Sequence, residues 1–459
     1  MAITNTPTEQ IVEIVAAQKE LFRSGKTLDI EFRISALKAL KAALRKWEKP
    51  LAEALWADLH KSYEEAYLTE LSIVIGEIDN HISHLKGWAS PKRCSTPLKM
   101  FPSRSKIISE PLGSALIISP WNYPVQLLLN PLVGAISAGC TAILKPSPYV
   151  EHVSKVIEQL IAETFDANYI AVVQGNRDVN TALLEQRYDI IFITGSPSLG
   201  RKVMAAAAKN LTPVVLELGG KSPCIVDKCA KLDVVARRIA WGKSLNAGQT
   251  CIAPDYLLVH SSIKDDFVSE LQKSFRKLLG KDPQSSHHFV RIVNDKAFQR
   301  LTGYLNSGNI IFGGRSDAKE RYIEPTVVSA TTSSPIMQEE IFGPIFPLLT
   351  FDSTGEAIDF VRQGEKPLAL YYFGNTATGR HVIERTSAGG SCINDTIMHI
   401  ANENVPFGGV GNSGMGTYHG RLSFEAFSHR RTVITTPTWI DLPFRYMPYK
   451  WFKVVKKLL

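Results

Sequence analysis

The spacing of apolar residues predicts helices throughout the first ninety residues of the chain. Between residues 34 and 47 an apolar side chain recurs at every third or fourth position, which indicates an amphipathic helix that ends near Pro50. An earlier helix is expected to begin at Thr8 and stop near Gly25, and a later one to run over residues 64–88. Stripes of this kind usually pack on the protein's own core, so we interpret them as structural rather than as partner surfaces.

The pattern changes at residue 114, where short runs rich in Ile, Val and Leu begin to alternate with helical stretches. This alternation is typical of a parallel sheet that is covered by helices on both faces. Ligands of such sheets bind at the carboxyl ends of the strands. The predicted strands are residues 114–119, 141–144, 170–173 and 189–194, with helices at 151–165 and 180–185.

A second alternating region is predicted from Val214 to about Asn394. Both halves of the chain are therefore expected to be α/β. The expected strands of this region are residues 214–218, 223–226, 256–259 and 346–349, and its expected helices are residues 230–243, 263–279 and 354–362.

An uncharged stretch at residues 111–144 is long enough to suggest a transmembrane helix. Three prolines interrupt it, however, and two of them lie on either side of Asn122. A helix broken at these points would leave backbone groups without partners in lipid. We therefore expect a buried strand, a loop, a buried helix and a second strand, and we reject a membrane span.

Composition places the 459-residue chain among globular proteins, with 44% hydrophobic and 21% charged residues. The net charge of +8 suits an anionic ligand such as a dinucleotide. Nucleic acid is not expected as a partner, because basic residues interleaved with aromatics occur only at the C-terminus. Six cysteines without Cys-x-x-Cys pairs predict no metal site and no disulfide framework. Free thiols, and an N-terminus without the layout of a secretory signal, lead us to expect a cytoplasmic protein.

A strand–turn–helix connection at residues 192–200 has features of a phosphate-binding loop. Gly195 permits a tight turn, Ser196 or Ser198 can cap the following helix, and Pro197 suits its first turn. Exposed amides at the start of such a helix can bind a pyrophosphate. The run is not Gly-x-Gly-x-x-Gly, so an ordinary connection explains this segment equally well until other motifs agree.

Cys251 and Glu217 are the two candidates for covalent chemistry. Cys251 lies between Gly248 and Pro254 in a polar, turn-forming run, so we expect it in a loop rather than in a buried helix. Glu217 lies in an apolar strand, where burial would raise its pKa toward that of a general base. A sulfur nucleophile and a carboxylate base are the groups needed to form a thioester and then to hydrolyse it.

Asn122 is a third candidate, on a rigid turn just after a predicted strand. Its side-chain amide could donate a hydrogen bond to a developing oxyanion. A structural turn asparagine is the alternative, and it is the preferred interpretation when the segment is considered alone.

Several blocks of sequence coincide, in order, with those of one family. They include Leu-Glu-Leu-Gly-Gly-Lys at 216–221 and Pro-Phe-Gly-Gly-Val-Gly-Asn-Ser-Gly-Met-Gly at 406–416, and the separation of Glu217 from Cys251 also matches. On these motifs the chain resembles the NAD(P)-dependent aldehyde dehydrogenases, most closely their class 3 branch of fatty and aromatic aldehyde enzymes. The other matching blocks are residues 120–124, 144–147, 192–200, 246–254 and 339–344.

The resemblance implies a role for each matching position. Cys251 would attack the aldehyde as a thiolate, the Asn122 amide and the Cys251 backbone N–H would hold the oxyanion, and Glu217 would activate water. Lys145 would contact the adenosine ribose, and Glu340 with Phe342 would position the nicotinamide ribose and ring. The full set of implied cofactor-binding residues is Ile118, Trp121, Lys145, Gly175, Gly195, Ser196, Gly200, Leu218, Gly219, Glu340 and Phe342.

The resemblance also implies an α/β fold of the aldehyde dehydrogenase type. It would comprise a Rossmann-type NAD(P)-binding domain, an α/β catalytic domain, and a small β element that bridges two subunits of a homodimer. By position these would be residues 1–90 with 113–216, residues 217–417, and residues 91–112 with 418–445, followed by a basic tail at 446–459.

One departure from the family pattern concerns the cofactor. Members that select NAD usually carry an acid three residues after the lysine, and here Pro148 occupies that position. Without a carboxylate to repel a 2′-phosphate, NADP should be tolerated, so either NAD or NADP is expected as cofactor. The implied substrates are medium- to long-chain aliphatic or aromatic aldehydes, with Tyr123, Met398 and Ile400 expected to line the substrate tunnel.

Two other functions deserve comparison. Transfer of the thioester to coenzyme A is disfavoured because Glu217 is present to activate water. A structural protein that reuses the fold without turnover would be expected to tolerate loss of Cys251, Glu217 or Asn122, and all three are intact.

The basic and aromatic tail at residues 442–459 allows two interpretations. Some class 3 relatives continue from a similar stretch into a membrane anchor, so a weak peripheral contact with an anionic membrane is one expectation. The other is that the tail covers the substrate entrance or packs on a neighbouring subunit. We favour the second because the amphipathic stretch is short.

Overall fold

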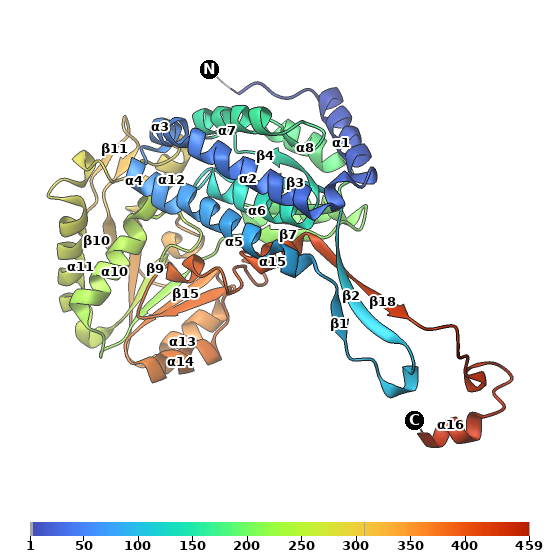
Figure 1. Ribbon diagram of the computed structural model, residues 1–459. Helices are drawn as coiled ribbons and strands as arrows, with labels where there is room; N and C mark the ends of the chain where they lie inside the picture. The colour runs from blue at the N-terminus through green and yellow to red at the C-terminus, as the bar shows by residue number, and fades with distance from the viewer. Residues whose placement is uncertain (1–2, 307, 459) are drawn as a thin grey trace.

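The computed structural model describes residues 3–306 and 308–458, and two large sheets flanked by helices form its body (Figure 1). The first sheet has six strands in the order β17-β7-β6-β3-β4-β5. The five strands from β3 to β7 run parallel, and β17 is antiparallel to β7. Their bounds are β3 (Ser114–Ile118), β4 (Thr141–Lys145), β5 (Ile170–Val172), β6 (Ile190–Thr194), β7 (Val214–Glu217) and β17 (Gly414–Met415).

The helices of the first region confirm the expected α/β alternation. The uncharged stretch forms β3, a loop, the buried helix α6 (Gln126–Ala138) and β4, as predicted. Among the residues that the structure describes, no helix is both long enough and apolar enough to cross a membrane. The helices that follow β4, β5 and β6 are α7 (Glu151–Thr164), α8 (Arg177–Glu185) and α9 (Pro197–Ala208).

The N-terminal region is helical, with one boundary different from the prediction. The stripe expected to end near Pro50 belongs to α2, which ends at Lys46, and Pro50 lies in the first turn of α3. Proline is tolerated there because the first turn of a helix needs no backbone N–H partner. The helices are α1 (Thr8–Arg23), α2 (Ile30–Lys46), α3 (Glu48–Leu59), α4 (Tyr63–Ala66) and α5 (Ser72–Ala89), with a π-helical turn, η2, at Tyr67–Leu71.

The second sheet has seven strands in the order β10-β13-β14-β9-β8-β15-β16, and only β10 pairs antiparallel with its neighbour. Its strands are β8 (Pro223–Val226), β9 (Tyr256–His260), β10 (Asn309–Phe312), β13 (Thr326–Ser329), β14 (Ile345–Phe351), β15 (Ala369–Phe373) and β16 (Gly390–Ile393). The helices α10 (Leu232–Ser244), α11 (Lys264–Leu279) and α13 (Thr354–Gln363) follow the predicted ranges closely.

Two segments lie in a different sheet from the one that the chain order suggested. The strand predicted at 214–218 begins the second alternating region along the chain, but β7 pairs with β6 in the first sheet. Strand β17, from the segment before residue 417, joins the same sheet beside β7. Strands β7 and β17 therefore form one edge of the first sheet, and Glu217 is paired with Gly414 there.

A three-stranded antiparallel sheet extends from the body as a long arm (Figure 1). It consists of β1 (Lys92–Cys94), β2 (Arg104–Pro111) and β18 (Ser428–Thr435). Between β17 and β18, helix α15 (Arg421–Ala426) packs on α6 rather than on the arm. Beyond β18 the chain continues to α16 (Phe452–Leu458), which lies away from the body.

Candidate active site

The carboxyl ends of four parallel strands bring several predicted residues to one edge of the first sheet. Ile118 is the register partner of both Lys145 and Ile193, and Thr194 is the partner of Glu217. These residues end or nearly end β3, β4, β6 and β7. This edge is where ligands of parallel α/β sheets bind.

The loop between β6 and α9 has the local structure that its residues predicted. Ser196, not Ser198, is the cap of α9, and its Oγ accepts a hydrogen bond from Leu199 N at 3.3 Å. Pro197 occupies the first helical position. The Gly195 N–H donates to the Glu217 carbonyl at 2.9 Å, so this turn is tied directly to the end of β7.

Glu217 is a buried carboxyl group with only 2% of its surface exposed. Neither carboxyl oxygen has a hydrogen-bond partner in the protein. Burial raises the pKa of Glu217 well above its ordinary value, because a charged carboxylate is poorly solvated there. This confirms the direction expected from the apolar strand, and it leaves both oxygens available to water or substrate.

Cys251 follows a backbone turn of unusual shape. Asn246 and Ala247 both have φ values of 50°, and Gly248 has a φ of 71°. A Cβ at Gly248 would lie 2.4 Å from the Gly343 carbonyl oxygen, so glycine is required on two counts. The half-buried Cys251 lies in a turn after this segment, as expected.

Electrostatics around Cys251 disfavour the thiolate in the protein alone. Burial, with smaller contributions from the Glu340 and Glu217 charges, raises the pKa of Cys251 to about 12. The backbone N–H groups of Cys251 and Ile252 act in the opposite direction. Burial therefore disfavours the charged thiolate of Cys251, and the thiol proton has to leave before or during attack.

Asn122 is held from two sides. Its backbone carbonyl accepts hydrogen bonds from Lys61 Nζ at 3.2 Å and from Asn246 Nδ2 at 2.9 Å. Its own Nδ2 donates to the Gln249 carbonyl at 3.0 Å, two residues before Cys251. Because an amide nitrogen carries two hydrogens, the second remains available to an oxyanion.

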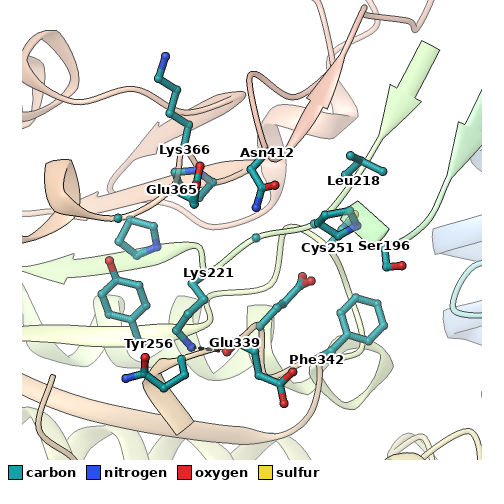
Figure 2. A pocket seen from close by; sticks show the side chains of 18 of the residues that line it. Ser196, Leu218, Lys221, Cys251, Tyr256, Glu339, Phe342, Glu365, Lys366 and Asn412 are labelled. Atoms are coloured by element: carbon teal, nitrogen blue, oxygen red, sulfur yellow. Dashed lines mark hydrogen bonds between the residues drawn. The ribbon is translucent and has the colours of Figure 1, made fainter. Parts of the chain in front are cut away.

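One cavity of about 880 Å³ brings Asn122, Glu217 and Cys251 together. Figure 2 shows Cys251, Ser196 and Phe342 gathered on one side of it. Residues from both sheets contribute to its wall, so the cavity lies between the two α/β units. The predicted cofactor-binding residues that line it are Trp121, Gly195, Ser196, Leu218, Gly219, Glu340 and Phe342.

Glu340 and Phe342 are placed by close packing. A Cβ at Gly219 would lie 2.2 Å from Glu340 Oε2, so the carboxylate rests on a glycine for which no other residue could substitute without displacement. Burial, aided by Asp255, raises the pKa of Glu340 to about 8. Phe342 has a φ of 53°, and its ring meets Trp121 edge-to-face with centroids 5.4 Å apart.

Four predicted cofactor residues do not line the cavity. Ile118 is buried, and Lys145 Nζ donates to the Pro146 carbonyl at 2.8 Å, with burial lowering its pKa to about 8. Packing accounts for the two glycines. A Cβ at Gly175 would lie 2.4 Å from a Val179 methyl carbon, and one at Gly200 would lie 3.0 Å from a Leu218 methyl carbon.

The residues expected to line a substrate tunnel are also outside this cavity. The Tyr123 hydroxyl contacts Thr250 Oγ1 at 2.8 Å in the interior, and Met398 is 48% exposed. Ile400 packs against the main core. That these three residues line a substrate tunnel on another side of Cys251 stays a prediction.

An ion pair that the sequence did not reveal supports the floor of the site. Lys221 Nζ contacts Asp255 and donates to the Glu339 carbonyl at 2.8 Å, a bond drawn in Figure 2. Asp255 Oδ2 accepts from the Ile341 N–H at 2.8 Å. Both residues lie in or beside matching sequence blocks, but their pairing depends on how distant segments meet. Among the described residues, no group of three or more His, Cys, Asp or Glu side chains is arranged to hold a metal ion.

Comparisons with known proteins identify the family of the chain. The family model described as "Aldehyde dehydrogenase family" matches residues 1–433. A 4,4'-diaponeurosporen-aldehyde dehydrogenase of Staphylococcus aureus is 50% identical over 444 residues, which cover 95% of this chain and 96% of that protein. A dimeric, NADP-preferring aldehyde dehydrogenase of Canis lupus familiaris is 44% identical, with 96% of this chain and 98% of that protein covered.

The fold has a solved counterpart. The substrate-bound state of Staphylococcus aureus AldH superposes with a TM-score of 0.96 at 48% identity, covering 98% of this chain and 99% of that one. The predicted fold class is thereby confirmed, together with the resemblance drawn from the sequence blocks. The chain belongs to the aldehyde dehydrogenase family, the NAD(P)-dependent oxidoreductases that oxidise aldehydes.

Proposed function

We propose that Cys251, Glu217 and Asn122 carry out aldehyde oxidation in the shared cavity. The observation that supports this most strongly is the meeting of an unpartnered buried carboxyl group, a half-buried thiol and an amide with a free hydrogen around one space. Cys251 gives up its thiol proton to solvent and attacks the aldehyde carbon as a thiolate, and Asn122 Nδ2 donates to the resulting oxyanion. The thiohemiacetal is oxidised to a thioester, and Glu217 takes a proton from water as that water attacks and releases the carboxylic acid.

The residues present fit a nicotinamide dinucleotide. The start of α9, with Ser196 and Pro197, faces the cavity, and Thr194 Oγ1 is buried without a partner at the end of β6. Glu340 would hold the nicotinamide ribose, and Phe342 would support the ring. When bound, the cofactor supplies the acceptor for the hydride removed from the substrate. Lys145 and Ile118, at the carboxyl edge outside the cavity, would serve the adenosine half.

The substrates that we propose are medium- to long-chain aliphatic or aromatic aldehydes. The family resemblance and the 4,4'-diaponeurosporen-aldehyde named for the Staphylococcus aureus relative support this class. The test is formation of reduced nicotinamide with a series of aldehydes of increasing chain length, together with benzaldehyde. A kcat/KM that rises with chain length agrees with the proposal, and activity confined to two-carbon and three-carbon aldehydes would contradict it.

We expect NADP to serve as a cofactor alongside NAD. Pro148 offers no carboxylate to repel a 2′-phosphate, and the relative from Canis lupus familiaris is named NADP-preferring. The kcat/KM for NADP should exceed that for NAD or lie within roughly a hundredfold of it. Roughly a hundredfold is the discrimination that one strong contact can provide. Replacing Pro148→Glu should lower the NADP to NAD ratio by about tenfold through charge repulsion.

The matched control is Pro148→Gln, which adds length without charge and should change that ratio little. A wild-type preference for NAD above roughly a hundredfold would show that another contact excludes the phosphate.

We propose that the chain forms a homodimer through its projecting arm. The first sheet with its helices would be the cofactor domain, the second the catalytic domain, and β1, β2 and β18 the bridging element. The exposed residues of β1 and β18 and the word "dimeric" in the name of one relative support this arrangement.

The tail beyond β18 we assign to the neighbouring subunit rather than to a membrane. Its aromatic side chains, such as Trp439 and Trp451, are largely exposed in the single chain. Contact with a second subunit would bury them. Cosedimentation with anionic vesicles, with and without residues 443–459, distinguishes the two. We expect neither protein to pellet with vesicles, whereas pelleting of the full chain alone would establish membrane contact.

A further inference from the structure

We infer that Glu65, a buried carboxylate outside the cavity, positions both Asn122 and the loop that carries Cys251. The inference rests on the roles proposed above for those two residues. Glu65 lies in the short helix α4, with 9% of its surface exposed. Its Oε1 accepts a hydrogen bond from the Asn246 N–H at 2.7 Å, across 181 positions of sequence.

Asn246 is also hydrogen-bonded to residues of the site. Its Nδ2 donates to the Asn122 carbonyl at 2.9 Å and to the Gln249 carbonyl at 3.0 Å. The Asn122 side chain donates to the same Gln249 carbonyl. Glu65 therefore anchors a residue that holds both the backbone of the oxyanion donor and the carbonyl that orients its amide.

The held segment is one that needs support. Asn246 and Ala247 both adopt positive φ values, which side-chain-bearing residues avoid unless their surroundings impose them. The segment is buried, and Cys251 follows five residues after Asn246. The Glu65 carboxyl oxygen is the acceptor for this buried backbone N–H, and a buried N–H left without an acceptor is costly. Removing it would free the first residue of the turn.

The neighbouring charges are committed to other contacts. Lys61 Nζ pairs with Glu70 at 2.6 Å and donates to the Asn122 carbonyl, while Glu70 Oε2 accepts from the Val125 N–H at 2.7 Å. Burial raises the pKa of Glu65 to about 7, opposed by Lys61 and by the Asn246 N–H. Burying a carboxyl group costs solvation free energy. Such a group is expected where its hydrogen bonds fix the positions of particular neighbours.

The experiment compares Glu65→Ala and Glu65→Gln with Glu64→Ala, an exposed acid of the same helix, in the full-length protein. Glu65→Ala should lower kcat by about tenfold or more, with the KM for NAD(P) unchanged within about twofold, because misplacement of reacting groups acts on the chemical step. Its rate of Cys251 alkylation by iodoacetamide should also change. Glu65→Gln should restore kcat to within about threefold of wild type, since the amide oxygen still accepts the Asn246 N–H.

For Glu65→Ala, kcat is divided by the fraction of protein whose Cys251 reacts with iodoacetamide. If this corrected kcat equals that of wild type and only the Tm is lower, Glu65 has a structural role alone and the inference is overturned. If Glu65→Ala does not fold, Glu65→Gln decides, and a loss of more than about tenfold in kcat there would overturn the acceptor role. Cys251→Ala, measured alongside, separates the two levels. If Cys251→Ala is inactive and Glu65→Ala is fully active, only the inference about Glu65 is refuted. If Cys251→Ala is active, the proposed function is refuted.

Discussion

Cys251→Ala is expected to abolish aldehyde-dependent formation of reduced nicotinamide, with a loss in kcat of roughly 10⁴-fold or more. Without the sulfur, no thiohemiacetal forms, and the aldehyde meets the cofactor without covalent attachment to the protein. The cavity wall is otherwise unchanged, because alanine removes only the Sγ atom of a half-buried side chain. The measurement is absorbance of reduced nicotinamide with NAD and with NADP, at saturating aldehyde.

Cys229→Ala is the matched control, because this thiol is exposed and lies outside the cavity. It should retain wild-type kcat and wild-type binding of the cofactor. Substantial oxidation by Cys251→Ala would remove the covalent mechanism, since Cys251 is the one cysteine among the described residues that line the cavity. Binding of NAD(P) followed by fluorescence should be retained in Cys251→Ala, which separates loss of chemistry from loss of the site.

Glu217→Gln is expected to stop turnover after the first oxidation. Glutamine preserves the shape of the side chain but cannot accept a proton from water, so the thioester should persist on Cys251. A burst of about one reduced nicotinamide per site should precede a steady rate lowered by roughly 10²–10⁴-fold. Rapid-mixing absorbance measures the burst, and mass spectrometry of the quenched protein should show the added acyl group.

Glu365→Gln, at an exposed acid on the same cavity, is the control and should keep wild-type turnover. Burial raises the pKa of Glu217 in the folded protein. As pH rises above the pKa of this group in the unfolded chain, the unfolded chain loses the proton more readily, and the free energy of unfolding falls. Glu217→Gln removes that penalty and should be at least as thermally stable as wild type at pH 8. A variant with no burst and no acylated protein would place Glu217 before thioester formation instead of after it.

Local features of the site could be read from the sequence because they depend on near neighbours. Ser196 and Pro197 begin α9 as their cap and first-turn preferences require. Glu217 is buried because the residues around it form an apolar strand. The expectation that Cys251 lies in a turn rested on its flanking glycine and proline.

Long-range features were missed for the opposite reason. Strand β7 follows the first region along the chain and precedes the second, and nothing in its apolar pattern says which sheet it joins. The strands β15 and β16 were not anticipated at all, because short apolar runs carry little periodicity. The cavity that holds Cys251 is lined by residues of both sheets and not by Tyr123, Met398 or Ile400, so their place along a substrate tunnel stays a prediction.

By itself, the sequence determined the family of this protein, the candidate thiol and carboxyl group, and the alternation of strands and helices around them. Tertiary structure alone decided that these groups share a cavity, that Lys221 meets Asp255, and that Glu65 reaches the backbone of Asn246. The physical reason is distance along the chain. Residue preferences act over one turn of helix or one strand, whereas these contacts form only when separate sheets and helices close around a common core.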